Sequence, residues 1–284
     1  PFSYVATTAA IVWENCTPVF VDINPYYLTI DETKIEAAIT DKTTCILATH
    51  VFGNPCNIQA IEHIANKHNL KVIYDAAHCF GVTYKGKSIF EYGDVSTCSF
   101  HATKLFHTGE GGALFTNDVK LSEKLFYHHN FGHKGALKFE GLGINAKMSE
   151  LQAAMGLAVL PYIEGILKGR KNVVDLYKQE LNFSRLGSIK IRDYTNWNYS
   201  YFPIIFNSEK QLETPYRDGG WTVRQVIHHL ADSQHPSYTR FKWALTENNP
   251  IIKACDENDW SEMFDAKTAP IELSINYLNA LHAK

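Results

Sequence analysis

The segment Asp94–Asp118, DVSTCSFHATKLFHTGEGGALFTND, decides the fold prediction. Its first part is a β-branched and apolar run bounded by polar residues, which predicts a short buried strand over 94–100. Residues 111–117 predict a second strand, entered through a Gly-Gly pair. Lys104 lies in the turn between the two strands. A lysine held there can be partly desolvated and form a Schiff base with a carbonyl, although most lysines in polar loops are solvated surface charges.

A second candidate, Asp75, lies within the upstream segment KVIYDAAHCF, residues 71–80. Residues with strong strand preference lead to this carboxylate, at the carboxyl end of a strand, where open α/β sheets bind their ligands. A carboxylate and a lysine at neighbouring strand ends suit pyridoxal 5'-phosphate (PLP). The aspartate keeps the pyridinium nitrogen protonated while the lysine holds the aldehyde. The alternative is an ordinary strand-end aspartate that caps the next helix.

Strands and helices alternate along residues 1–147, which we expect to form one large domain. Asp31 and Asn57 are the expected N-caps of two helices. The further elements are strands at 18–23 and 44–50, and helices at 7–14, 31–39, 57–69 and 119–130. This alternation predicts an α/β fold with a mainly parallel sheet covered on both faces.

Residues 148–210 are predicted to link this domain to a partial small domain. Ser149 and Gln152 form a capping box that starts a long helix. Pro161 should break or kink that helix. Two strands are expected after it, at 188–192 and 199–206.

The composition argues against several classes of protein. The 284 residues are 45% hydrophobic, enough for one large or two ordinary domains with real cores. A net charge of −3 and scattered basic residues argue against a nucleic-acid partner. No apolar run approaches the roughly 20 residues of a membrane helix. Several of the 6 cysteines lie in apolar strands without a C-x-x-C pair, so we expect reduced thiols and a cytoplasmic protein.

The motifs around Lys104 resemble those of the DegT/DnrJ/StrS sugar aminotransferases, PLP enzymes with the aspartate aminotransferase fold (fold type I). The resemblance runs in order from residue 1 to about residue 207. It rests on PFSYVATTAAI, TPVFVDI, HVFGNP, YDAAH, SFHATKLFHTGEGGALFTND and GLGINAKMSELQAAMGL. It implies transfer of an amino group, usually from glutamate, to a keto sugar attached to a nucleotide.

The resemblance also implies the roles of the site residues. Lys104 would be the Schiff-base lysine and Asp75 the partner of the ring nitrogen. His78 would contact the cofactor, Ser99 its phosphate, and Tyr4 would stack on its ring. Asn145 matches an asparagine that reaches the cofactor phosphate of a neighbouring subunit. A homodimer is therefore expected.

Residues 211–284 lack strand alternation and predict helices joined by polar turns. Thr222 and Gln225 form a second capping box. The apolar stripe after it consists of Val223, Val226, Ile227 and Leu230. At about 100° per residue, His228 points away from this stripe and His229 falls at its edge, where it could face a bundle interior. An adjacent pair of histidines on a helix is nevertheless more often exposed to solvent than part of a metal site.

This segment resembles the DinB/YfiT-like metal-dependent hydrolases, on the motifs GGWTVRQVIHHLADS and RFKWALTENNPIIK. The resemblance marks His229 as a ligand of a divalent metal. In that family the other two ligands lie in an H-x-x-x-H segment close to the C-terminus, and this sequence has no such segment after His229. We therefore expect an incomplete metal site.

The two resemblances meet near 207–214 without a Gly-, Ser- or Pro-rich linker, which predicts two truncated families joined together. The chain starts without Met, and the Gly-Thr phosphate loop of the aminotransferases is absent from it, so we expect a fragment. Three hypotheses follow. They are a PLP-dependent sugar aminotransferase, a metal-dependent hydrolase or thiol-dependent transferase led by His229, and a non-enzymatic folded remnant.

Overall fold

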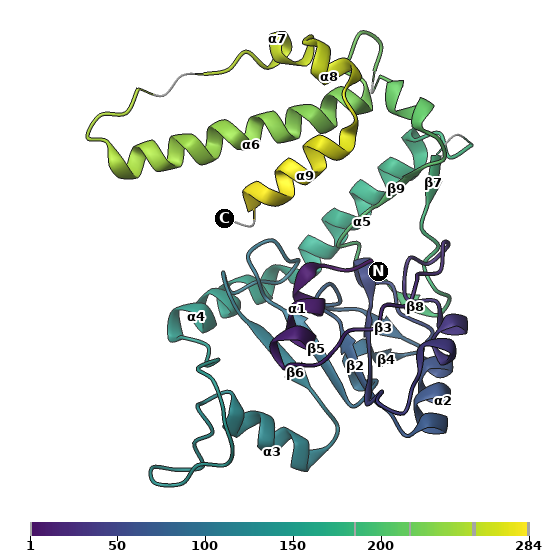
Figure 1. Ribbon diagram of the computed structural model, residues 1–284, viewed down its shortest axis with the longest axis vertical. Coiled ribbons are helices and arrows are strands. Elements are labelled where there is room, and N and C mark those ends of the chain that lie inside the picture. Colours follow the sequence, from purple (N-terminus) through teal and green to yellow (C-terminus); the bar gives the residue numbers. More distant parts are fainter. Residues whose placement is uncertain (1, 185, 216, 252–253, 283–284) are drawn as a thin grey trace. The chain divides into compact units, whose positions relative to one another are not determined.

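A computed structural model describes residues 2–184, 186–215, 217–251 and 254–282 (Figure 1). The chain divides into two compact units. The first unit comprises Pro1–Phe183 with Ser188–Ile204, and the second comprises Ser184–Gly187 with Ile205–Lys284. Within the described residues, no helix is long and apolar enough to cross a bilayer.

A four-stranded sheet organises the first unit, in the order β1-β2-β5-β6. Its strands are β1 (Cys45–Thr49), β2 (Lys71–Asp75), β5 (Val95–Ser99) and β6 (Gly112–Phe115). β1, β2 and β5 are parallel, whereas β6 returns antiparallel to β5. In register, Thr49 is opposite Asp75, and Asp75 is opposite Thr97. The α/β prediction is confirmed, with an antiparallel edge strand added to the parallel sheet.

Helices begin where the sequence places capping side chains. Asn57 accepts a hydrogen bond from the Ala60 amide and starts α2 (Ile58–His68). Asp118 accepts from the Lys120 and Leu121 amides and starts α3 (Val119–His128). The buried face of α2 consists of Ile58, Ile61, Ile64 and Ala65, which join the main hydrophobic core with residues of β1 and β2. Burial of this apolar stripe holds the helix to the sheet.

The predicted strand at 18–23 is wrong. α1 (Val5–Trp13) precedes this stretch, which then pairs only through an isolated bridge between Ile23 and Ile30 among the described residues. Val19 and Phe20 remain 64% and 54% exposed. A strand needs a neighbour for its backbone hydrogen bonds, and β preference alone does not provide one.

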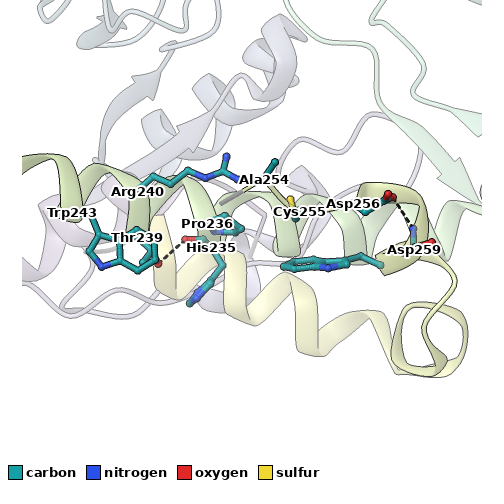
Figure 2. Close-up of a pocket in the computed structure, with 10 residues that line it drawn as sticks. His235, Pro236, Thr239, Arg240, Trp243, Ala254, Cys255, Asp256 and Asp259 are labelled. Carbon is teal, nitrogen blue, oxygen red and sulfur yellow. Dashed lines mark hydrogen bonds between the residues drawn. The ribbon is translucent and has the colours of Figure 1, made fainter. Parts of the chain in front are cut away.

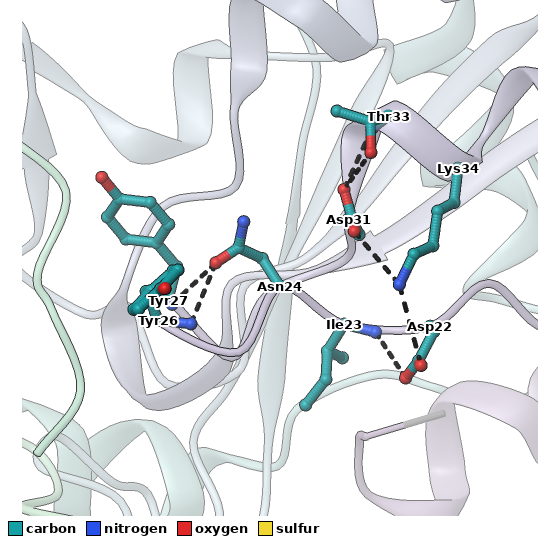
Figure 3. A network of polar contacts seen from close by, with 8 residues as sticks. All are labelled: Asp22, Ile23, Asn24, Tyr26, Tyr27, Asp31, Thr33 and Lys34. Carbon is teal, nitrogen blue, oxygen red and sulfur yellow. Dashed lines mark hydrogen bonds and ion pairs between the residues drawn. The ribbon is translucent and has the colours of Figure 1, made fainter. Parts of the chain in front are cut away.

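Residues 31–39 form two short 3₁₀ turns, η1 (Glu32–Lys34) and η2 (Glu36–Ala38), in place of the predicted α-helix. The expected cap is present, because Asp31 Oδ1 accepts from the Thr33 amide at 3.2 Å and the Thr33 hydroxyl at 2.7 Å. Lys34 lies between Asp31 and Asp22, at 3.2 and 3.8 Å (Figure 3). The Thr33 hydroxyl and then Lys34 lower the pKa of Asp31 against the opposing effect of burial.

The first unit also contains several short elements. They are η3 (Val51–Gly53), β3 (Thr83–Tyr84), β4 (Lys87–Ser88), η4 (Ile89–Glu91) and β8 (Thr195–Asn196). β3 pairs with β4 and β8 in a second, antiparallel sheet. In this sheet Tyr84 pairs with Thr195, and the Lys85 amide donates to the Tyr194 carbonyl.

The capping box at Ser149 and Gln152 is confirmed at the start of α4 (Glu150–Val159). Pro161 lies in the 3₁₀ turn η5 (Leu160–Tyr162), which separates α4 from α5 (Ile163–Glu180) as predicted. The strands after α5 are shorter than expected. β7 (Leu186–Ser188) pairs with β9 (Ile204–Phe206), so most of the predicted strand at 188–192 does not form.

The second unit is helical beyond β9. It contains η6 (Glu209–Glu213), α6 (Val223–Thr246), α7 (Glu257–Ser261), α8 (Phe264–Thr268) and α9 (Ile271–His282). Thr222 and Gln225 form the predicted capping box of α6. A cleft of about 470 Å³ lies along α6 (Figure 2). Two tryptophans line it together with polar side chains, among them Trp243, Trp260, His235, Thr239 and Cys255.

Candidate active site

Asp75 ends β2 with both of its carboxylate oxygens engaged. Oδ1 accepts a hydrogen bond from the Ala77 amide at 3.1 Å. Oδ2 accepts from the hydroxyl of Thr7, in the first turn of α1, at 2.6 Å. The carboxylate lies at the carboxyl end of the parallel strands, as predicted, and the two bonds fix its orientation.

Lys104 lies in the loop that joins β5 to β6. Its backbone amide donates to the His101 carbonyl, which holds it in a tight turn. The side chain is half-buried, and this desolvation lowers the pKa of the Lys104 amine, while the negative charge of Asp75 opposes the shift. The Lys104 amine thus stays partly accessible to solvent, and a larger fraction of it is neutral than in a fully solvated lysine.

His78 stands in the turn after β2, beside both groups. Its Nδ1 accepts from the Phe52 amide at 3.2 Å, so the neutral ring carries its proton on Nε2. Burial, followed by the positive charge of Lys104, lowers the pKa of His78 to about 4. The ring stacks on Phe52 and packs against Tyr201, with ring centroids 6.3 and 4.6 Å away. His78 is therefore a neutral hydrogen-bond donor at neutral pH.

A narrow cleft joins Lys104 and His78 within the first unit. Its lining comes from the turn after β2, the loop after β5 and the stretch before β9: Ala77, His78, Phe80, Thr103, Lys104, Leu105, Ser200 and Tyr201. Tyr201 is half-buried, and burial raises its pKa. Neither Tyr201 nor Thr7 was among the site residues predicted from the sequence. The only signal for Tyr201 was the aromatic-rich run WNYSYF at 197–202.

Ser99 ends the strand that precedes the Lys104 loop, and Tyr4 precedes the helix that carries Thr7. Ser99 is the last residue of β5, and its hydroxyl accepts from the His101 amide at 3.3 Å. Tyr4 is the N-cap residue of α1, one turn before Thr7, and is 76% exposed.

Asn145 is on a different part of the unit. It forms an isolated bridge with Asn130, and its amide oxygen accepts from Lys147 Nζ at 2.5 Å. It is exposed, and no contact described for it involves Asp75 or Lys104. Among the described residues, the structure thus brings Asp75, His78 and Lys104 together without Asn145.

The prediction for the two histidines of α6 is wrong. His228 is the buried one, 4% exposed, with Nδ1 2.7 Å from the Ser274 hydroxyl and Nε2 3.0 Å from the Ala269 carbonyl. His229 is half-buried and packs against the Trp221 ring. The buried face of α6 carries Gln225, His228 and Ala231. Gln225 donates to the Ser261 carbonyl at the end of α7, so tertiary contacts and not the apolar stripe decide which face is buried.

No metal centre forms around His229. In the ranges that the structure covers, no group of three or more His, Cys, Asp or Glu side chains could hold an ion. The three-histidine site suggested by the second resemblance is therefore not supported.

The sequence profile of the DegT/DnrJ/EryC1/StrS aminotransferase family matches residues 1–236. The chain belongs to this family. The match continues past residue 207 into α6, beyond the point where the resemblance was expected to end. The comparisons give no support to a DinB/YfiT-like segment.

Two curated relatives are dTDP-4-amino-4,6-dideoxy-D-glucose transaminases. The one from Shigella dysenteriae is 46% identical over 213 residues, covering 75% of this chain and 58% of the relative. The one from Escherichia coli is 38% identical over 261 residues, covering 89% of this chain and 66% of the relative. The chain thus spans about three fifths to two thirds of their lengths.

Solved structures agree with the fold. A family aminotransferase from Brucella abortus has a TM-score of 0.69 at 25% identity, covering 74% of this chain and 59% of that one. DesI, solved in the presence of its TDP-sugar product, has a TM-score of 0.70 at 25% identity, covering 99% and 76%.

Proposed function

We propose that this chain carries the cofactor-binding part of a PLP-dependent aminotransferase that acts on a nucleotide-linked keto sugar. The observation that carries the proposal is the pairing of a partly desolvated amine, Lys104, with the strand-end carboxylate of Asp75. Membership of the aminotransferase family supports it. The names of the relatives point to dTDP-linked sugars as the substrate class.

Lys104 and His78 of the cleft, together with Asp75 at the end of β2, fit PLP in chemical type. Bound PLP supplies an aldehyde that accepts an amino group and a ring that acts as an electron sink. Lys104 Nζ would hold the aldehyde, and its lowered pKa favours the neutral amine that forms this bond. Asp75 would accept a hydrogen bond from the protonated ring nitrogen. His78 would donate from Nε2 to an oxygen of the ring substituents.

The remaining roles follow the same scheme. Ser99 would bind the phosphate from the end of β5, and Tyr4 would cover the ring from the start of α1. Asn145 would act on the cofactor phosphate of a second copy, which makes a homodimer part of the proposal. Glutamate is the proposed amino donor. The six free thiols, three of them buried, favour a reducing compartment such as the cytoplasm.

The proposal is tested by trapping PLP on the protein. The full chain is incubated with PLP, reduced with borohydride, digested and mapped by mass spectrometry. We expect a pyridoxyl group on the peptide that contains Lys104 and none on that peptide in Lys104→Arg, which keeps a positive charge. An unlabelled Lys104 peptide at saturating PLP would refute the assignment.

The donor is tested in the same preparation. L-glutamate added to the loaded protein should yield 2-oxoglutarate and bleach the visible absorbance of the lysine-bound cofactor. The control is D-glutamate, which presents its amino group with the wrong hand. Equal yields from the two enantiomers would contradict a specific amino-donor site.

A further inference from the structure

The Thr7 hydroxyl that donates to Asp75 belongs to a row of three hydrogen-bonded hydroxyl groups. Thr7 Oγ1 lies 2.6 Å from Asp75 Oδ2 and 2.7 Å from Ser3 Oγ. Ser3 Oγ lies 3.1 Å from Thr49 Oγ1. These side chains come from the start of α1 and the end of β1, and Thr49 is opposite Asp75 in the sheet register. These hydrogen bonds therefore connect α1, β1 and β2 around the Asp75 carboxylate.

The carboxylate sets the direction of every hydrogen bond in this row. An ionised carboxylate only accepts, so Thr7 donates its single hydroxyl hydrogen to Asp75. Thr7 must then accept from Ser3, and Ser3, having used its own hydrogen, must accept from Thr49. Hydrogen bonds aligned in this way polarise one another and strengthen the terminal bond.

From this geometry we infer that Thr7 is a positioning residue that orients Asp75 toward the ring nitrogen of PLP. The inference rests on the proposed function. Ala77 holds Oδ1 and Thr7 holds Oδ2, so rotation of the carboxylate about its bond to Cβ is blocked from both sides. The unused lone pairs of the Asp75 carboxylate then point in a fixed direction. A ring nitrogen needs such a fixed acceptor for a short, well-aligned hydrogen bond.

Thr7→Val tests the hydroxyl, because valine keeps the branched shape and removes the donor. The expected result is a rise of about tenfold or more in the dissociation constant of PLP, because the carboxylate loses a hydrogen bond that holds its orientation. Thr7→Ser restores the donor and should bind PLP within about threefold of the wild type. Thr8→Val, on the next residue of α1, is the matched control and should leave PLP affinity unchanged.

A double-mutant cycle separates positioning from general damage. On an Asp75→Ala background, Thr7→Val should have no further effect on PLP affinity, because its target is gone. Equal losses from Thr7→Val on both backgrounds, or wild-type affinity in Thr7→Val, would overturn the role of Thr7 alone. A wild-type chain that forms no covalent adduct at Lys104 would overturn the proposed function, and with it this role.

Discussion

The side-chain amide of Asn198 donates a hydrogen bond to the backbone carbonyl of His78 at 2.8 Å, across 120 residues of sequence. The same amide donates to the Phe80 carbonyl at 2.9 Å, and its oxygen accepts from the Ser200 amide at 3.2 Å. Asn198 is 1% exposed. One buried side chain thus holds the turn that carries His78 against the segment that carries Tyr201.

Asn198→Ala should destabilise the first unit by about 2–4 kcal/mol, because it leaves buried carbonyl and amide groups without partners. The measurement is denaturant unfolding followed by tryptophan fluorescence. Asn196→Ala is the matched control, since Asn196 is exposed in β8. Similar losses in the two variants would show that Asn198 has no special structural role.

Lys104 should react with amine reagents at lower pH than Lys71. Burial lowers the pKa of Lys104, whereas a hydrogen bond to Asp94 raises the pKa of Lys71, so the neutral amine appears first at Lys104. Labelling across a pH series, quantified by mass spectrometry for both peptides, gives the two midpoints. A midpoint for Lys104 at or above that of Lys71 would contradict the desolvation of its amine.

His78 should make the protein less stable as the pH falls. Its folded pKa of about 4 lies below its ordinary value of 6.5, so the unfolded state binds more protons between these values. The free energy of unfolding should therefore drop across this window, by about 1–2 kcal/mol after allowance for partial solvent exposure.

The check is the difference in unfolding free energy between about pH 7 and about pH 5 in the wild type and in His78→Gln. The variant should show a smaller drop, because glutamine does not titrate. His50, fully buried with its pKa lowered to about 3, remains in both proteins and contributes equally to each. An unchanged drop in His78→Gln would contradict the burial of its neutral ring.

In the helical unit, His228→Ala should lower thermal stability and His229→Ala should not. The ring of His228 contacts both the Ala269 carbonyl and the Ser274 hydroxyl, so its loss should cost about 1–3 kcal/mol. Purified wild type and His229→Ala should also contain equally little zinc. Greater destabilisation by His229→Ala, or zinc that disappears with it, would contradict this assignment.

Local chemistry made several helix starts and two strands predictable. Asn57, Ser149 and Thr222 cap their helices as expected, because a capping side chain satisfies amides only two or three residues away. The strands that end at Asp75 and Ser99 were also predictable, since buried parallel strands are continuous apolar runs. The position of Asp75 at the carboxyl end of β2, and that of Lys104 in the loop after β5, follow from these strands.

Only the tertiary structure decided which partners these elements meet. The stretch 18–23 has strand preference but, among the described residues, forms a single bridge, because backbone hydrogen bonds require a neighbour that sequence preference cannot supply. His228 is buried in place of its neighbour because the packing of α6 sets the buried face. The sequence determined Asp75 and its place on β2. The fold alone brought Thr7 to its carboxylate and Asn198 to the turn behind it, since both contacts join residues far apart in the chain.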